Sequence, residues 1–223
     1  MTQDNPSSMT VEVWADVVCP WCRLGHAYLE QALSDFDHSD EVAVVWRSFE
    51  LDPAAPRQQD GTLTDHLVAK LGRDRQEIHE LNGMIVARGC EVGVDFRFDD
   101  AQPGNTFDAH RLLHLAADRG LASELMNRLY SAYFTEGLAI GDPSTMEALA
   151  IEVGLDADEV RAVLASDQYA DRVRRDEAEA RDLQVSGVPF FVFDRRLAAA
   201  GAQPAEVLLA GLQQAWDSRP PAP

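Results

Sequence analysis

Cysteine is scarce in this sequence, which has three cysteines among 223 residues. Cys19 and Cys22 are three positions apart and Cys90 stands alone, so the chain has no framework of structural disulfides. Positive charge is scarce as well: 19 basic residues stand against 38 acidic ones, and the formal net charge is −19. A surface of this sign repels nucleic acids and anionic membranes, so we expect neither as a partner. We attribute the acidic excess to solubility.

Long hydrophobic runs are also lacking. No stretch of the sequence approaches the length of a membrane-spanning helix, and the polar residues 1–9 lack the charged-then-apolar pattern of a signal peptide. We therefore expect a cytoplasmic protein, in which a disulfide would be transient rather than structural. With 46% hydrophobic residues, the chain can form one domain with a large insertion. The sequence does not indicate the oligomeric state.

The Cys-x-x-Cys pair lies where one periodicity gives way to another. Apolar and polar residues alternate over 11–17, which predicts a strand. After Cys22 the apolar residues recur at helical spacing, which predicts a helix from 20 to about 37. Cys19 therefore falls at a strand-to-helix junction, with Pro20 in the first turn, where a helix tolerates proline.

This position has a chemical consequence for the two thiols. Free backbone N–H groups and the positive end of the helix dipole would face Cys19 and lower the pKa of its thiol from roughly 8.5. Cys22, one turn further into the helix, would attack a mixed disulfide formed at Cys19. The alternative is half of a zinc site, which needs four ligands. His26 and Cys90 are the plausible extra ligands, and neither has finger-like spacing, so we expect no metal.

The rest of the chain predicts further strands on either side of a helical region. Residues 42–49 form a second strand, parallel to the first because a helix crosses between them. A loop with two prolines follows at 51–61, and strands return at 187–193 and 197–200 before a final helix. The helices expected in between are 62–71, 75–90, one from Asn105 or Thr106 to Gly120, 121–135, one that begins at Asp142, 157–165 and 169–183, with a short extended piece at 94–98. The buried positions expected in the final helix are Val207, Leu208, Leu212 and Trp216.

A Cys-x-x-Cys at a strand-to-helix junction, in the order β-α-β, helices, β-β-α, resembles the thioredoxin fold. The helical insertion between the two halves resembles the DsbA family. The stretches that narrow the resemblance to the FrnE-like branch of that family are DVVCPWC, VVWRSFELDP, PGNTFDAHRLLHLA, YFTEG, IGDP, VSGVPFFVFD and GAQP. The resemblance implies an α/β, thioredoxin-like fold with a large all-helical insertion. Its parts would be 10–56 and 187–217 for the thioredoxin-like domain, 57–186 for the insertion, and 1–9 and 218–223 for flexible tails.

The resemblance also adds residues to the expected site. Pro189 matches the cis-proline opposite the active-site cysteines of thioredoxin-like folds. It would leave the Val188 backbone beside Cys19, able to pair with an extended substrate. The alternative for Pro189 is an ordinary proline at the start of a strand. Pro20 and Trp21, between the cysteines, would belong to the substrate-facing surface.

Three features depart from the family pattern. Val13 stands where thioredoxins carry a buried acid, so the proton acceptor of Cys22 is unidentified and Asp16 is a candidate. Arg23 stands where this branch commonly has an aromatic residue, and we expect it to be exposed. No second cysteine pair occurs near the C-terminus, so a role that needs one is not implied.

Other residues with reactive or charged side chains have simpler interpretations. Cys90 has no nearby partner, and we expect it to be buried and inert. His110 and His114 are four positions apart without a third ligand, so a helix surface or satisfied polar contacts are expected. We expect His26 at an exposed helix position, and the charge-rich 169–183 as a solvated helical face.

Three functions fit these residues. The first is a thiol–disulfide oxidoreductase that exchanges disulfides with protein or low-molecular-weight thiol substrates through Cys19 and Cys22. It would need no cofactor beyond its redox-active disulfide, with glutathione as a candidate co-substrate. The second is a glutathione-dependent isomerase or transferase of the 2-hydroxychromene-2-carboxylate isomerase or kappa-class type, which typically has serine where Cys19 stands. The third is a non-enzymatic, redox-sensitive chaperone.

Overall fold

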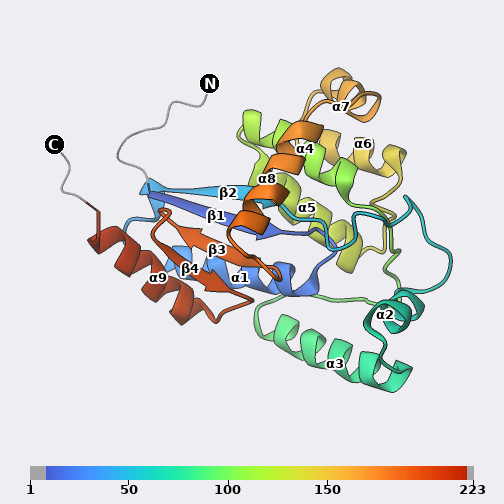
Figure 1. Ribbon diagram of the computed structural model, residues 1–223, viewed down its shortest axis with the longest axis horizontal. Helices are drawn as coiled ribbons and strands as arrows, with labels where there is room; N and C mark the ends of the chain where they lie inside the picture. The colour runs from blue at the N-terminus through green and yellow to red at the C-terminus, as the bar shows by residue number, and fades with distance from the viewer. Residues whose placement is uncertain (1–8, 220–223) are drawn as a thin grey trace.

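The computed structural model describes residues 9–219 as a four-stranded sheet flanked by helices, with a helical region at one end (Figure 1). The strands are β1 Met9–Ala15, β2 Val42–Ser48, β3 Phe190–Phe193 and β4 Leu197–Ala200. The α-helices are α1 Pro20–Ser34, α2 Leu63–Leu71, α3 Arg75–Glu91, α4 Phe107–Asp118, α5 Ala122–Phe134, α6 Pro143–Glu152, α7 Ala157–Leu164, α8 Ala170–Asp182 and α9 Ala205–Asp217. The predicted α/β class and the order β-α-β, helices, β-β-α are confirmed.

The sheet has the strand order β2-β1-β3-β4. β1 pairs in parallel with β2, as the helical crossover through α1 requires. β3 runs antiparallel to β1, with Trp14 opposite Phe190. The end of β1 and the start of β3 therefore meet at the same end of the sheet.

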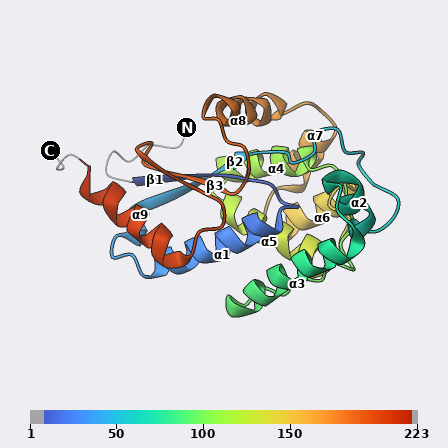
Figure 2. The same cartoon turned by 60° about the horizontal axis from the view of Figure 1, so that its bottom comes forward.

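Helices cover both faces of this sheet. α1 and α9 pack together on one face, and α8 lies over the other (Figure 2). Trp14 of β1 points to the α8 side, where its indole N–H donates to the carbonyl of Asp176 at 3.0 Å. Trp46 of β2 points to the α1 side, where its ring meets His26 edge-on, with 4.7 Å between centroids. Side chains that point to opposite faces of the sheet thus find packing partners on the helices of both faces.

Two helices of the inserted region begin close to their predicted starts and have side-chain caps there. The side chain of Thr62 accepts the N–H of Asp65, and Asp142 accepts the N–H of Thr145 before a first-turn proline. None of the helices in the described part of the chain is long and apolar enough to cross a bilayer. The division of the chain into 10–56, 57–186 and 187–217 stays a prediction.

The first strand ends earlier than expected, and the short extended piece expected at 94–98 joins no strand of the sheet. β1 ends two residues early because residues 16–19 form a turn, closed by the N–H of Cys19 on the carbonyl of Asp16 at 3.1 Å. Residues 94–98 do not form a strand. Phe96 and Phe98 instead stack on each other and meet the ring of Phe134 edge-on, so aromatic packing replaces strand pairing there.

Two expectations near the chain ends are also corrected. Met9 was expected in a flexible tail, but it lies in β1 and is fully buried. The rest of the predicted N-terminal tail and residues 220–223 lie outside the described residues. In α9, Val207 is 45% exposed and Trp216 is half-buried, because the side that faces the core carries Leu208, Leu212 and Ala215.

Gly25 allows a close approach between α1 and the start of β3. A Cβ atom at this position would lie 2.7 Å from Cγ of Pro189 and 3.2 Å from Cζ of Phe191. Contacts this short force either the helix or the proline segment to move. Glycine here therefore fixes the distance between the cysteine-bearing helix and Pro189.

We predict that Gly25→Ala lowers the free energy of unfolding by about 1–3 kcal/mol through this overlap. The matched control is Gly83→Ala in α3, where a new Cβ meets no atom within 4 Å and helix propensity should add about 0.5–1 kcal/mol. Urea titration of both variants measures the two changes. Equal stability of Gly25→Ala and the wild type would contradict the packing argument.

Candidate active site

Cys19 and Cys22 lie at the N-terminus of α1, as predicted. Cys19 is the N-cap residue with an extended backbone (φ −88°, ψ 112°), and Pro20 occupies the first turn. Cys19 is 4% exposed and Cys22 is 1% exposed, and both are free thiols. The two sulfur atoms therefore belong to the interior of the protein, with Cys22 the more enclosed.

The environment of Cys22 favours its protonated form. Burial raises the pKa of the Cys22 thiol well above its usual range, and the hydrogen bond and charge of Cys19 raise it further. A hydrogen bond from the backbone N–H of Asp16 acts in the opposite direction. Cys22 therefore needs a nearby base before it can act as a nucleophile.

The segment before β3 meets Cys19 from the other side. The Cys19 thiol donates to the carbonyl of Val188 at 3.6 Å, and the peptide bond between Val188 and Pro189 is cis. Val188 is 9% exposed. The structure thus brings together the cysteines and the proline segment that the sequence analysis expected to face each other.

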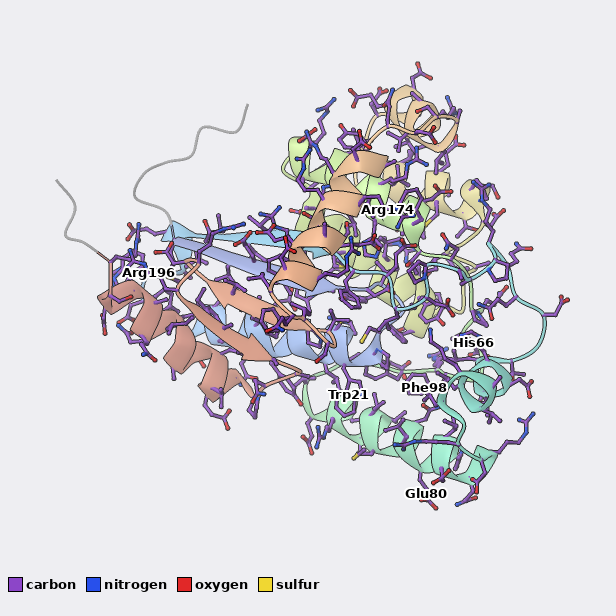
Figure 3. All side chains as sticks on the ribbon, in the orientation of Figure 1. Trp21, His66, Glu80, Phe98, Arg174 and Arg196 are labelled. Atoms are coloured by element: carbon purple, nitrogen blue, oxygen red, sulfur yellow. The ribbon has the colours of Figure 1, made fainter. Side chains whose placement is uncertain are left out.

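Trp21 connects the motif to the inserted helices. The Arg88 guanidinium of α3 lies 5.3 Å from the centre of the Trp21 ring. Figure 3 shows Trp21 between α1 and α3. The dipeptide between the cysteines therefore packs against the insertion, and Pro20 and Trp21 are both half-buried.

Buried ionisable side chains line the inner side of the cysteine pair. Asp16 and His110 are fully enclosed, and Oδ1 of Asp16 lies 3.4 Å from Nε2 of His110. The other Asp16 oxygen accepts the N–H of Leu51 at 2.7 Å. The hydroxyl of Tyr130 is buried nearby, and burial together with charge at Cys22 raises its pKa. Asp16 was a candidate from the sequence, whereas its contact with His110 appears only in the folded structure. The expectation of a helix surface or satisfied polar contacts for His110 was wrong, because α4 buries this side chain and its Nε2 makes no hydrogen bond.

His26 and Arg23 are less exposed than expected. His26 is 4% exposed, because α1 turns it toward Trp46, and burial lowers the pKa of its imidazole to about 4. Arg23 is half-buried, with its guanidinium 5.8 Å from the centre of the Tyr130 ring. Both expectations of an exposed helix position were therefore wrong.

A second buried histidine–aspartate pair lies on the α8 side of the sheet. Nε2 of His114 lies 3.2 Å from Oδ2 of Asp176, and the other Asp176 oxygen accepts from Arg47 at 3.1 Å. Ser48 also contacts His114 at 3.2 Å. The satisfied polar contacts expected for His114 are confirmed. The view of 169–183 as a wholly solvated face was wrong, because Asp176 is 2% exposed.

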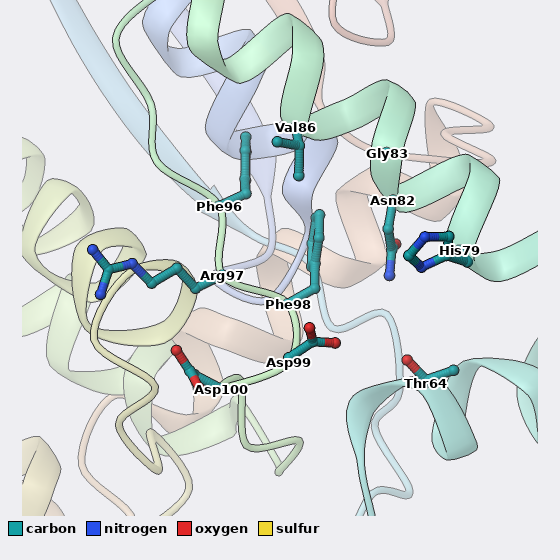
Figure 4. Close-up of a pocket in the computed structure, with 10 residues that line it drawn as sticks. All are labelled: Thr64, His79, Asn82, Gly83, Val86, Phe96, Arg97, Phe98, Asp99 and Asp100. Carbon is teal, nitrogen blue, oxygen red and sulfur yellow. The ribbon is translucent and has the colours of Figure 1, made fainter.

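Cys90 and one pocket lie on the insertion. Cys90 is exposed rather than buried, because α3 turns Ile78, Ile85 and Gly89 inward and leaves Cys90 on its outer side. A pocket of about 410 Å³ opens between α2, α3 and the 96–100 loop. Its lining, in which Asn82 and Asp99 point toward each other (Figure 4), includes neither motif cysteine nor Pro189.

Comparison with known proteins places this geometry in a family. The sequence pattern of the DSBA-like thioredoxin domain matches residues 10–213. The chain belongs to the DsbA-like thioredoxin domain family. The expected family and the thioredoxin-like fold with a helical insertion are thereby confirmed.

Three individual proteins show how similar this chain is to known sequences and structures. The crystal structure of a probable DsbA oxidoreductase from Streptomyces coelicolor superposes with a TM-score of 0.90, at 44% identity over 96% of this chain and 93% of that one. The uncharacterized protein YwbO of Bacillus subtilis (strain 168) is 29% identical over 184 residues, 82% of this chain and 85% of YwbO. A 2-hydroxychromene-2-carboxylate isomerase superposes with a TM-score of 0.69 at 16% identity, over 92% and 95% of the two chains. That identity shows a shared fold alone.

The buried imidazole of His26 predicts a pH dependence of stability. Its pKa of about 4 in the folded protein lies below the ordinary 6.5, so between these values the unfolded chain binds a proton that the folded protein does not. Stability should therefore fall as the pH drops from 6.5 to 4, by about 3 kcal/mol from this residue.

Urea unfolding across this pH range tests the assignment. His26→Gln should remove that part of the pH dependence, whereas His79→Gln, at an exposed position of α3, should leave it unchanged. If the free energy of unfolding depends on pH in the same way for His26→Gln and the wild type, His26 is not the source of the pH dependence.

Proposed function

We propose that this protein is a thiol–disulfide oxidoreductase of the FrnE-like branch of its family, with Cys19 and Cys22 as the redox pair. The observation that carries the proposal is the arrangement of two free thiols at one helix N-terminus. Cys19 faces the Val188 carbonyl, and Cys22 lies enclosed behind it with a raised pKa. Both thiols are buried, with Cys19 beside the segment that precedes β3 and Cys22 deeper in the protein.

The reaction follows from these positions. The Cys19 thiolate attacks a disulfide of the substrate, forms a mixed disulfide and releases one substrate sulfur as a thiolate. Cys22 then loses its proton and attacks the Cys19 sulfur, which releases the second substrate thiolate. The substrate gains two electrons and the Cys19–Cys22 pair loses two. Run in reverse, the same steps oxidise a substrate dithiol.

The surroundings of Cys19 support a polypeptide or small thiol as the partner. The Val188 carbonyl accepts the Cys19 hydrogen bond, so an extended chain that paired with Val188 would lie beside the reacting sulfur. Pro189, Pro20 and Trp21 would hold that chain in place. No cofactor takes part in these steps, and glutathione is a candidate co-substrate. A cytoplasmic location suits a transient disulfide.

A second candidate is a glutathione-dependent isomerase, because a 2-hydroxychromene-2-carboxylate isomerase shares the fold. Such enzymes typically have serine where this chain has Cys19, which favours the redox function. Saturable, non-covalent glutathione binding together with isomerase turnover in a Cys22→Ser protein would support the second candidate instead.

We predict that Cys22→Ser traps covalent adducts with disulfide substrates. Without the second thiol, decay of the mixed disulfide should slow by about 100-fold or more, because an intramolecular attacker of high effective concentration is lost. Cys19→Ser should form no adduct. Intact-protein mass spectrometry over time measures both results.

Both variants are made in a Cys90→Ser background, because Cys90 is exposed and could form adducts of its own. Cys90→Ser alone should exchange disulfides at the wild-type rate. A Cys22→Ser protein that forms no adduct with any disulfide would contradict the assigned roles.

A further inference from the structure

Unpaired polar atoms gather behind the cysteine pair. In the described part of the chain, seven buried side-chain nitrogen or oxygen atoms make no hydrogen bond. Five of them belong to residues of the motif helix or to the side chains packed around it: Oδ1 of Asp16, Nη1 of Arg23, Nδ1 of His26, Nε2 of His110 and the hydroxyl of Tyr130. Buried polar groups without partners are costly, so such a concentration indicates a functional requirement.

Asp16 is the member of this group tied most directly to the reacting sulfurs. Its carbonyl accepts the N–H of Cys19 at 3.1 Å, and its N–H bonds to Cys22. Its carboxylate is fully buried and has one oxygen occupied by the N–H of Leu51. The other oxygen faces His110 of α4 at 3.4 Å. A change of charge at Cys22 therefore acts on Asp16, which contacts His110.

The neighbouring groups are poor acceptors for the Cys22 proton. Burial raises the pKa of Tyr130 and of Tyr133, so both phenols keep their protons. Burial lowers the pKa of His26 to about 4, so its imidazole is a weak base. The Arg23 guanidinium is positively charged and has no proton-accepting site. Of these side chains around the motif, Asp16 and His110 are left as bases.

We propose that Asp16 and His110 together accept the proton of Cys22 when Cys22 attacks the mixed disulfide. The inference rests on the redox function proposed above and assigns its missing proton acceptor. The S–H bond of Cys22 breaks, its proton moves to the Asp16–His110 pair, and its electron pair forms the bond to Cys19. The Cys19 bond to the substrate sulfur breaks at the same time, and that sulfur leaves as a thiolate.

Pairing an acid with an imidazole lets the added proton be held without an isolated buried charge. With one proton between them, Asp16 and His110 are either both neutral or an ion pair. Glu50, from the loop after β2, is the further acid that acts on His110, and its own carboxylate accepts from Arg174 at 2.6 Å. Glu177 accepts from the same Arg174 nitrogen at 2.8 Å.

The test separates the two steps of the reaction in a single turnover. Protein in a Cys90→Ser background reacts with dithiobis(nitrobenzoate), whose released thiolate absorbs visible light. Attack by Cys19 releases the first thiolate, and attack by Cys22 releases the second. The rate of the second phase is measured from about pH 5 to about pH 9, the range in which general bases titrate.

Asp16→Asn should slow the second phase by about 100-fold near neutral pH, the usual size of a lost general base. The difference from wild type should shrink as the pH rises, because hydroxide then takes the Cys22 proton. His110→Gln should slow the same phase and shift its pH midpoint. A purely structural role would lower the rate equally at every pH.

The second histidine–aspartate pair provides matched controls. Asp176→Asn and His114→Gln remove the same groups from the α8 side of the sheet, and both should keep the wild-type pH profile of the second phase. If Asp16→Asn does not fold, as judged by circular dichroism, His110→Gln decides the question. A wild-type profile in Asp16→Asn, or in His110→Gln when it alone folds, would overturn the assignment while leaving the redox function intact. Absence of a second phase in the Cys90→Ser parent would instead overturn the redox function.

Discussion

β1 and β3 run side by side in opposite directions, with Trp14 opposite Phe190, and this pairing brings the two halves of the site together. The end of β1 leads through a tight turn to Cys19, and the chain that enters β3 carries Val188 and Pro189. Segments some 170 positions apart in sequence therefore meet, and the Cys19 thiol reaches the Val188 carbonyl. Gly25 keeps α1 close enough to Pro189 for this contact.

The inserted helices complete the site rather than merely covering it. α3 brings Arg88 against Trp21, α4 brings His110 to Asp16, and α5 brings the Tyr130 hydroxyl behind the sulfurs. Each of these groups is held by a helix that packs against the sheet or against a neighbouring helix. The thioredoxin-like half thus supplies the thiols, and the insertion supplies groups that surround them with charge and hydrogen-bonding capacity.

Local sequence patterns predicted the helices and strands well, because the residues that determine each element lie within it or next to it. Alternation before Cys19, helical spacing after it and the first-turn Pro20 fix the strand-to-helix junction. The burial of the charged side chains was not predicted, because their partners are distant in sequence. Asp176 shows that a signal was nonetheless present: Val173, Asp176 and Ala180 share one helix face, and all three are buried. An acidic residue that shares a helix face with apolar residues indicates a buried carboxylate with a charged partner. The composition of the helix alone suggested a solvated face.

The central claim is that Cys19 and Cys22 form a reversible redox couple. Equilibration in glutathione buffers of graded potential, followed by mass-spectrometric counting of free thiols, tests it directly. We expect the Cys90→Ser protein to lose both remaining thiols together in a single two-electron transition, which reverses when the buffer is made reducing. If no Cys19–Cys22 disulfide forms across the whole range, the claim is wrong.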